Sequence, residues 1–344
     1  MKTVLVGLGM VADTHLAAIR DAEGIELAGV MGRDPARAQA FADKASAAVG
    51  YAVPVRSSLA EIAEDRTVDF VTIATPPDAR QELVDALSAA GKPILMEKPI
   101  ERTLAAAEAL VARCETAQVP LGIVLQHRAR AASQKLKQLL DGRALGQVAT
   151  VEIRVPWWRD QAYYDAPGRG TYARDGGGVM INQAIHTLDL ALWLLGPVRR
   201  VQAMLRTTPL HRMEAEDWAG ALLEFDSGAC GSLMATTSAY PGEAESLSLQ
   251  GEKAAAHLAS GVLTVTHLDG RVETFGAEAT TGGGADPMGF THAWHQHVLE
   301  DFAHCLISGA TPLASGRSAL EAHRVIDAME RASRSGHITE ITRP

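Results

Sequence analysis

Two short segments carry the side chains best suited to moving a proton. Lys98 lies in Glu97-Lys98-Pro99, directly after the apolar run Pro93–Met96. His186 lies in Gly176–Asp189, a segment that begins with three glycines. A lysine in a desolvated pocket can lose its proton near neutral pH, and an imidazole exchanges one there without perturbation. The two side chains could therefore accept a hydroxyl proton or return one.

The segment around His186 reads as a helix with a polar face. Asn182 and His186 are four residues apart, and Asp189 follows three residues later. On an α-helix these spacings bring the three side chains to one face. Each unsatisfied polar group buried there would cost about 1–3 kcal/mol, so a role is expected for them. We predict a catalytic role for Asn182 and His186; Asp189 either orients His186 or satisfies nearby backbone groups, and we favour this second, structural role.

A glycine-rich turn opens the chain and predicts a dinucleotide site. Gly7–Ala12 reads G-x-G-x-x-A between an apolar strand and a helix. In that arrangement the glycines permit a tight turn and close approach of a pyrophosphate, which then sits on the helix N-terminus. A glycine turn without a ligand is the alternative. The predicted cofactor contacts here are Gly7, Gly9, Met10, Val11 and Ala12.

The end of the second expected strand bears on which nicotinamide cofactor binds. Gly32 stands where an acidic residue would bind the ribose 2′-hydroxyl, and Arg33 follows, a type that can bind a 2′-phosphate. We therefore favour NADP over NAD, while Asp34 reads as a helix cap. Further predicted cofactor contacts lie where later strands end, although the first two also fit a proline-rich turn: Thr75, Pro76, Glu97, Lys98 and Gln126.

Aromatic and basic residues upstream of His186 suit a sugar ring. They lie in Trp157-Trp158-Arg159, Tyr163-Tyr164 and Arg169-Gly170-Thr171, and packing on a sheet explains them equally well. The predicted substrate contacts are Arg128, Trp158, Tyr163, Arg169, Asn182 and His186. Near the C-terminus, His292, His295 and His297 lack a cysteine or paired carboxylate to complete a ligand set, so no metal site is predicted.

The elements around these residues predict two domains. The first part alternates short apolar runs with helical patterns, which is typical of a doubly wound parallel sheet. After about Gln126, consecutive strand-like segments joined by turns such as Asp226-Ser227-Gly228 predict an open, mainly antiparallel sheet in an α+β domain. We place a Rossmann domain at residues 1–122 and a substrate-binding and oligomerisation domain at 123–344, whose last helices could pack back on the first.

The predicted strands and helices, by residue range, are as follows. The expected strands of the first part are Thr3–Val6, Glu26–Met31, Phe70–Ala74, Pro93–Met96 and Leu121–Leu125. Its expected helices are Val11–Arg20, Pro35–Ala47, Asp78–Ala90 and Leu104–Gln118. The second part is expected to hold strands Gln147–Val155, Val198–Arg206, Asp217–Phe225 and Ala229–Thr237, and helices Trp294–Ile307 and Ser315–Arg334.

Composition limits the classes of partner. The 344 residues are 47% hydrophobic and carry a net charge of −9, so no global field draws the chain to nucleic acid or an anionic membrane. No apolar stretch approaches the roughly 18 residues that would span a bilayer. The first residues read as a strand rather than a signal peptide, and the three separated cysteines suit a reducing compartment. We expect a cytoplasmic protein.

These motifs together resemble the Gfo/Idh/MocA oxidoreductases over nearly the full chain. The matching residues are Gly7–Ala12, Thr75-Pro76-Pro77, Glu97-Lys98-Pro99, Gly176–Asp189 and Gly309-Ala310-Thr311-Pro312. The resemblance implies NAD(P)-dependent oxidation or reduction of a sugar, sugar acid or inositol-type polyol, with Lys98 and His186 handling the proton. It also implies a homodimer or homotetramer formed through the C-terminal sheet.

The chain departs from the family pattern at two positions. Many members carry Asp where Asn182 stands, and since an amide cannot act as a base, Asn182 is expected to orient substrate or His186. Arg80 occupies a position where the pattern leads us to expect His. Two other functions stay open: a catalytically silent NAD(P)-binding sensor of the same fold, and a reductase of a non-sugar ketone or imine.

Overall fold

The chain divides into two compact units. The computed structural model describes residues 1–284 and 286–343. Unit 1 comprises Met1–Gln126 and His292–Leu320, and unit 2 comprises His127–Thr291 and the chain from Glu321 onward. Each unit has its own hydrophobic core.

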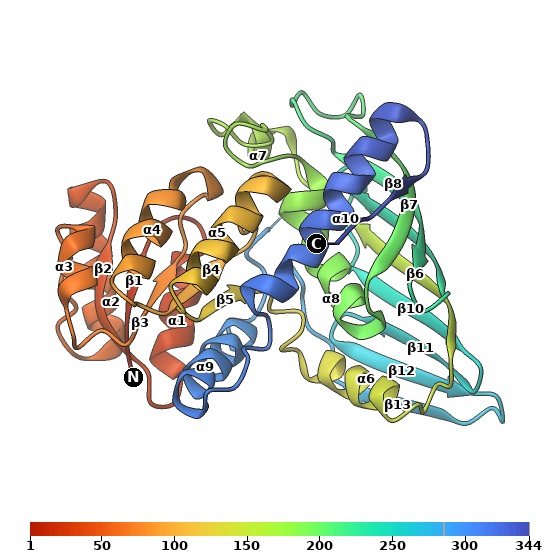
Figure 1. Cartoon of the computed structure of the whole chain (residues 1–344), viewed down its shortest axis with the longest axis horizontal. Helices are drawn as coiled ribbons and strands as arrows, with labels where there is room; N and C mark the ends of the chain where they lie inside the picture. The colour runs from red at the N-terminus through yellow and green to blue at the C-terminus, as the bar shows by residue number, and fades with distance from the viewer. Residues whose placement is uncertain (285, 344) are drawn as a thin grey trace. The chain divides into compact units, whose positions relative to one another are not determined.

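Unit 1 is built on a five-stranded parallel sheet with the order β2-β1-β3-β4-β5. Strands β3, β4 and β5 are buried along their whole length, as expected for parallel strands covered on both faces. The sheet is therefore a doubly wound Rossmann sheet, as the alternating pattern predicts (Figure 1). Its strands are β1 (Lys2–Val6), β2 (Glu26–Met31), β3 (Phe70–Ile73), β4 (Ile94–Glu97) and β5 (Leu121–Val124).

Helices cover the sheet of unit 1, and one of them comes from late in the chain. That helix, α9, places Phe302 against Gly122 of β5, where an added Cβ would lie 2.6 Å from the ring. The segment after it pairs with the same strand, since the Ile123 amide donates to the Ala314 carbonyl at 2.8 Å. The helices of this unit are α1 (Ala12–Asp21), α2 (Pro35–Val49), α3 (Leu59–Glu64), α4 (Gln81–Ala89), α5 (Leu104–Thr116) and α9 (Ala293–Ser308).

Unit 2 is built on a nine-stranded sheet with the order β13-β12-β11-β10-β6-β9-β8-β7-β14. Only β6 and β9 pair in parallel among its described ladders, so the sheet is mainly antiparallel, as predicted. The strands are β6 (Val148–Pro156), β7 (Val198–Arg206), β8 (Trp218–Phe225), β9 (Cys230–Thr236), β10 (Ser246–Gly251), β11 (Ala254–Ala259), β12 (Val262–His267), β13 (Val272–Gly276) and β14 (Thr339–Glu340).

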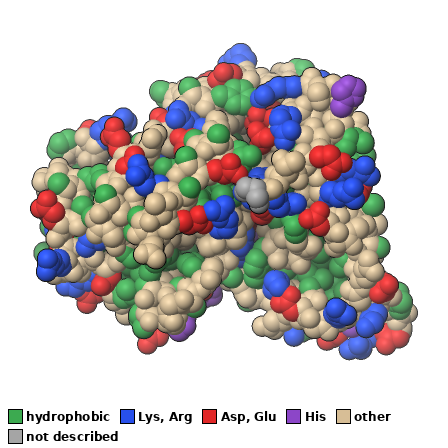
Figure 2. All heavy atoms as spheres, viewed as in Figure 1, with side chains coloured by type: hydrophobic (Ala, Val, Ile, Leu, Met, Phe, Trp, Pro, Cys, Tyr) green, Lys and Arg blue, Asp and Glu red, His purple; other side chains and the backbone are tan. Residues whose placement is uncertain are grey.

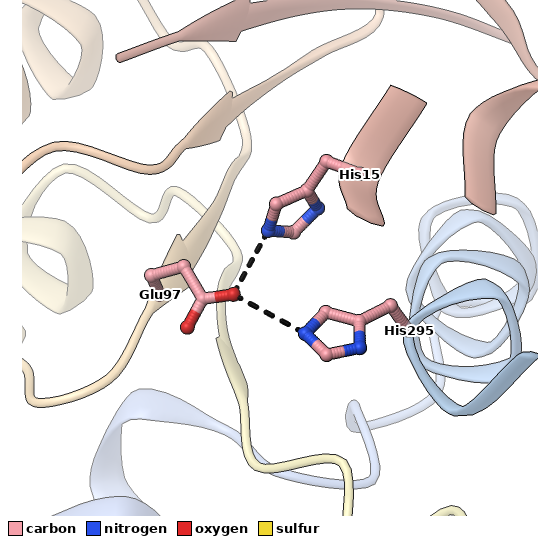
Figure 3. A group of neighbouring side chains, drawn as sticks. All are labelled: His15, Glu97 and His295. Carbon is pink, nitrogen blue, oxygen red and sulfur yellow. Dashed lines mark hydrogen bonds and ion pairs between the residues drawn. The ribbon is translucent and has the colours of Figure 1, made fainter. Parts of the chain in front are cut away.

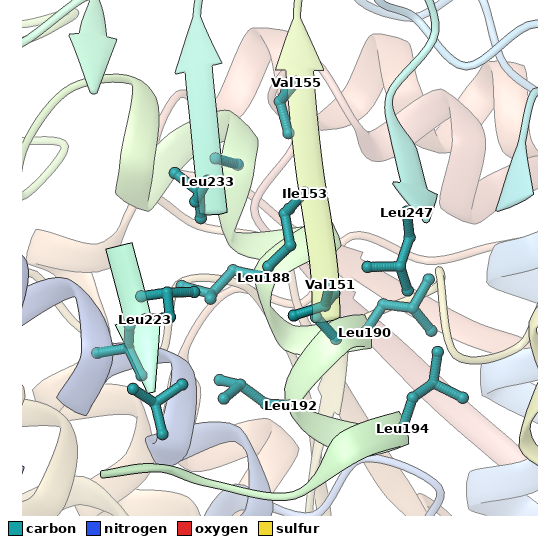
Figure 4. Packing of buried hydrophobic residues seen from close by; sticks show 14 of the residues in the cluster. Val151, Ile153, Val155, Leu188, Leu190, Leu192, Leu194, Leu223, Leu233 and Leu247 are labelled. Atoms are coloured by element: carbon teal, nitrogen blue, oxygen red, sulfur yellow. The ribbon is translucent and has the colours of Figure 1, made fainter. Parts of the chain in front are cut away.

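One face of this sheet carries the core of unit 2. The strands alternate buried and exposed residues, and the buried set packs under the helices. Figure 4 shows α8 lying beside β6, with Leu188 close to Ile153 and Leu233 among the packed side chains. The helices of this unit are α6 (Ala131–Asp141), α7 (Gln161–Asp165), α8 (Ile185–Leu195) and most of α10 (Gly316–Ser335), whose first turns belong to unit 1.

The surface in view mixes acidic and basic side chains over both the helices and the loops (Figure 2). This mixture agrees with the absence of basic runs in the sequence. Over residues 1–284 and 286–343, no helix combines the length and the apolar character that crossing a bilayer requires.

Candidate active site

The predicted cofactor residues gather at one edge of the Rossmann sheet. Because all five strands run parallel, their carboxyl ends share an edge, which is where open α/β sheets bind ligands. Along it follow the ends of β2, β1, β3, β4 and β5. These ends carry, in that order, Gly32-Arg33, Gly7–Ala12, Thr75-Pro76, Glu97-Lys98 and Gln126.

The turn after β1 fits a pyrophosphate. Gly7 has φ +99°, and a Cβ there would lie 2.6 Å from the Thr75 amide nitrogen, so no other residue fits. Helix α1 begins at Ala12, with no side-chain hydrogen bond capping its N-terminus. Its N-terminus and its dipole are therefore suited to bind an anion such as the phosphates of a dinucleotide.

At the end of β2, Asp34 has a structural role and Arg33 is a candidate cofactor ligand. Asp34 caps α2 by accepting from the amides of Ala36 and Arg37 at 2.9 and 3.1 Å. Arg33 is exposed beside it. Asp34 therefore has the capping role that its sequence predicts, and Arg33 presents its side chain to solvent at the carboxyl edge.

Arg80 donates hydrogen bonds to the backbone of the loop that carries Lys98. This guanidinium is only 1% exposed and donates twice to the Thr75 carbonyl, at 3.1 and 2.7 Å. It also donates to the carbonyls of Glu97 and Pro99. Burial lowers the pKa of Arg80 to about 10, against the pull of Glu97 and other carboxylates, so the group stays charged. Arg80 thus ties the end of β3 to the end of β4.

Two histidines contact the Glu97 side chain. His15 Nε2 of α1 lies 2.8 Å from Glu97 Oε1, and His295 Nε2 of α9 lies 3.5 Å from the same oxygen (Figure 3). Burial works to raise the pKa of Glu97, but the two imidazoles outweigh it and hold the pKa well below its usual range. Burial lowers the pKa of His295. The three residues link α1, the end of β4 just before Lys98, and α9.

This trio has the residue types of a zinc site but the geometry of a hydrogen-bonded cluster. At 2.8 Å, His15 Nε2 is within direct hydrogen-bonding distance of the carboxylate. Its buried Nδ1 has no hydrogen-bond partner among the described residues, whereas a metal-bound imidazole usually donates its other N–H. No local pattern marks His15, and His295 stands out only beside His292 and His297, because Glu97 is distant from both histidines in the chain.

In unit 2, the helix that carries His186 begins with a π-helical turn. Met180–Ala184 forms that turn and α8 starts at Ile185, so the α-helical spacing predicted between Asn182 and His186 is wrong. The Asn182 amide donates back to the carbonyls of Gly177 and Gly178 at 2.8 and 3.0 Å. Such turns are frequent at functional sites, and this one places Asn182 at the entry to α8.

Glu216 fixes that entry and was missed by the sequence analysis. Its carboxylate accepts from the amides of Gly178 and Met180 at 3.1 and 3.0 Å. Gly178 is obligatory, because a Cβ there would lie 1.7 Å from the Glu216 carbonyl oxygen. Burial raises the pKa of Glu216 to about 7, despite these backbone donors.

His186 and Asp189 both lie buried in α8, but Asp189 has its own partner. Arg128 donates to both of its carboxylate oxygens, at 2.7 and 2.6 Å, and neither side chain is more than 3% exposed. Asp189 is therefore held by a side-chain ion pair rather than by the nearby backbone groups expected from its sequence. Arg128, predicted to contact substrate, has its guanidinium engaged within the unit by this carboxylate.

The other predicted substrate residues form one aromatic and basic cluster in unit 2. The Arg169 guanidinium lies 4.8 Å from the Tyr163 ring centroid, and Gln183 of the π-helical turn donates to the Tyr163 hydroxyl at 3.3 Å. Tyr163 packs edge-on against Tyr164, which contacts His211. Trp158 also lies near His211, with ring centroids 6.1 Å apart. The structure therefore connects Trp158, Tyr163 and Arg169 to the segment that leads to His186.

Both parts of the chain match one protein family. Residues 1–124 match the profile of its NAD-binding Rossmann fold, described as an oxidoreductase family, and residues 133–257 match its C-terminal domain. A solved WlbA dehydrogenase from Bordetella pertussis, in complex with NADH and UDP-GlcNAcA, is 30% identical, with a TM-score of 0.82 over 100% of this chain and 99% of that one. The chain belongs to the Gfo/Idh/MocA oxidoreductases.

Curated members of the Gfo/Idh/MocA family align at similar identity. D-apiose dehydrogenase from Rhizobium rhizogenes is 26% identical across 99% of this chain and 97% of its own length. Myo-inositol 2-dehydrogenase from Thermotoga maritima is 26% identical across 67% of each chain. Family membership confirms the resemblance drawn from the motifs, the two-part fold and the assignment as an oxidoreductase with an NAD-binding Rossmann unit.

Proposed function

We propose that this oxidoreductase is an NAD(P)-dependent dehydrogenase of a sugar, sugar acid or inositol-type polyol. The observation that carries the proposal is the edge of the Rossmann sheet, where Lys98 follows β4 two strands from the glycine turn after β1. A bound nicotinamide would supply the hydride acceptor or donor. Relatives named as apiose and inositol dehydrogenases support an alcohol carbon of a small carbohydrate as the reacting centre.

In this proposal Lys98 and His186 serve the same substrate hydroxyl. His186, assisted by Lys98, takes the proton during oxidation or returns it during reduction, and Asn182 orients the substrate. Support comes from the elements that fix each side chain: Arg80 ties down the Lys98 loop, and buried α8 carries His186. Trp158, Tyr163 and Arg169 are proposed to contact the sugar, because aromatic faces and charged donors suit its ring and hydroxyls. Arg128 remains a weaker candidate, since Asp189 already engages it.

For the cofactor, we propose a preference for NADP. Position 32 is a glycine, so it lacks the acidic side chain that would bind a free 2′-hydroxyl, and exposed Arg33 supplies a cation for a 2′-phosphate. For assembly, we propose a homodimer or homotetramer through the open face of the nine-stranded sheet. Met204 and Leu222 are 48% and 65% exposed there, which suits a surface that another copy covers.

The test is a nicotinamide absorbance assay across a panel of sugars, sugar acids and inositols. With an active substrate, Lys98→Ala and His186→Ala are expected to lower turnover by about 10²–10⁴-fold, the usual loss of acid–base assistance. Lys44→Ala and His337→Ala, at exposed positions, are the matched controls. Unchanged turnover in both active-site variants would reject the assignment. NADPH binding without turnover on any panel member would favour a sensor, and turnover only on ketones or imines would favour the third function.

A further inference from the structure

A second histidine lies flat against His186 within unit 2. The ring centroids of His127 and His186 are 5.0 Å apart and their planes differ by 27°, which is a stacked pair. His127 is 2% exposed and His186 is 6% exposed. His127 comes from the segment between β5 and α6, whereas His186 comes from the first turn of α8. The contact therefore joins two segments that the sequence separates by about sixty residues.

The hydrogen bond to Arg130 defines the protonation state of His127. Arg130 Nη2 lies 2.5 Å from His127 Nε2. A guanidinium has only donors, so Nε2 must accept, and the ring is then neutral with its proton on Nδ1. The same Nε2 lies 3.7 Å from Glu245 Oε1, too far for a hydrogen bond. The shorter contact, with Arg130, is the one that sets the tautomer.

Arg130 is itself fixed by a buried ion pair. Its Nη1 donates to Glu245 Oε1 at 2.6 Å, and the two side chains are 8% and 4% exposed. Arg130 directly precedes α6 and Glu245 directly precedes β10, so the pair anchors to two separate elements. Burial lowers the pKa of Arg130, and Glu245 opposes that shift. The charge of Arg130 is balanced by Glu245, and His127 carries none.

We propose that His127 is a positioning residue for His186, held in place by the Arg130–Glu245 pair. The inference rests on the proposed role of His186 as proton acceptor. Helix α8 fixes the Cα of His186, but the second side-chain torsion of a histidine is broad, so the direction of its ring nitrogens needs a further constraint. The stacked ring contributes to that constraint, because it restricts the plane in which the His186 nitrogens lie. Because it is neutral, it places no added positive charge against His186 when that ring takes a proton.

Two substitutions in the full-length enzyme distinguish the effect of a flat ring at position 127 from the effect of side-chain size. His127→Leu removes the flat face, and we expect kcat to fall about 10–100-fold, the cost of a misdirected catalytic group. The KM for the sugar should change less than about threefold, because substrate contacts are untouched. His127→Phe keeps a flat ring and should retain kcat within about threefold. His337→Leu, at an exposed position after α10, is the matched control. Full activity in His127→Leu, or equal losses in the Leu and Phe variants, would overturn the proposal.

A measurement on the wild-type chain covers the case in which His127→Leu does not fold. Ring-nitrogen NMR, with His127 assigned by its absence in His127→Phe, should show a neutral ring protonated at Nδ1 from about pH 5.5 to 8.5. The groups that face the ring are Arg130, Glu245 and His186. A His127 ring that takes a second proton in that range would show that Arg130 does not fix it and would overturn the proposal.

The His186→Ala variant separates failure of this inference from failure of the proposed function. If His186→Ala keeps full turnover, the proton acceptor is wrongly assigned and both proposals fall. If His186→Ala loses turnover while His127→Leu keeps it, the proposed function stands and only the positioning role is rejected. Losses in both, with Phe rescuing position 127, support the two together.

Discussion

Arg128 and Asp189 form a two-pronged ion pair in the interior of unit 2. The guanidinium Nε and Nη2 donate to separate carboxylate oxygens at 2.7 and 2.6 Å, and Asp189 is 1% exposed. Burial raises the pKa of Asp189, while Arg128 opposes that shift. The pair joins the segment before α6 to the middle of α8, one turn beyond His186.

Removing one member of this pair should destabilise unit 2 strongly. In Asp189→Asn the guanidinium stays buried without its counter-charge, so we expect a loss of about 3–5 kcal/mol in the free energy of unfolding. Urea unfolding followed by fluorescence measures it, because unit 2 holds Trp157, Trp158, Trp193 and Trp218. Asp327→Asn, which breaks an exposed pair with Arg331, should cost less than about 0.5 kcal/mol. Similar losses in both variants would show that burial does not decide the effect.

Glu216 should make the stability of unit 2 depend on pH. Its folded-state pKa of about 7 lies above the ordinary 4.5, so the folded state binds the proton more tightly than the unfolded chain. Its contribution to stability is then complete below pH 4.5 and is lost as the pH rises to about 7. We expect the wild-type chain to lose roughly 3 kcal/mol relative to Glu216→Gln across that window.

The comparison uses unfolding free energies of both chains at several pH values. Gln cannot ionise, so its variant should keep the stability that the wild-type chain loses. Glu214→Gln, at an exposed site nearby, should follow the wild-type curve. Parallel curves for wild type and Glu216→Gln would mean that Glu216 does not titrate in this range.

Local pattern was enough to predict the strands of unit 1, but in unit 2 it left out the strands β10 to β14 and the helices α6 and α7. Buried parallel strands such as Phe70–Ile73 read as short apolar runs, because both faces of the sheet are covered. The turn at Asp226-Ser227-Gly228 predicted a hairpin, and Gly228 indeed has φ +87°. The glycine turn predicted the start of α1 within one residue of Ala12. In each case, the signal lies within a few residues of the feature that it predicts.

The parts that sequence reasoning missed depend on partners that are distant in the chain. Glu97 meets His15 and His295, and no local pattern links three residues on separate elements. The π-helical turn at Met180–Ala184 begins beside the Glu216 contacts to Gly178 and Met180, and Glu216 is distant from it in the chain. Helical spacing was applied to Asn182 because periodicity alone cannot reveal an inserted residue.

Cofactor choice should respond to the two residues at the end of β2. We expect Arg33→Ala to weaken NADP binding about tenfold while leaving NAD binding unchanged, since only NADP carries the phosphate that Arg33 would bind. Gly32→Asp should shift preference towards NAD by supplying a ribose ligand, and its new Cβ would meet the side chains of Leu8 and Ala38, at 3.0 and 3.6 Å. Fluorescence titration measures both dissociation constants. Arg66→Ala is the control for loss of an exposed positive charge, and an unchanged NADP affinity in Arg33→Ala would remove Arg33 from the site.

Arg80 should matter for both stability and turnover, because it holds the loop that carries Lys98. In Arg80→Met the buried carbonyls of Thr75, Glu97 and Pro99 lose their donor, and each such group costs about 1–3 kcal/mol. We expect a loss of about 2–5 kcal/mol in the free energy of unfolding. The looser Lys98 loop should also lower kcat at least about tenfold, since small displacements of catalytic groups are costly.

Arg113→Met is the matched control, because that arginine is 58% exposed and pairs only at the surface with Asp85. The decisive comparison is kcat at a temperature where both variants are fully folded by circular dichroism. A folded Arg80→Met enzyme with the turnover of the control would show that Lys98 keeps its position without the guanidinium. A folded enzyme with reduced kcat and unchanged NAD(P) affinity would show that the hydrogen bonds of Arg80 position the Lys98 loop rather than the glycine turn.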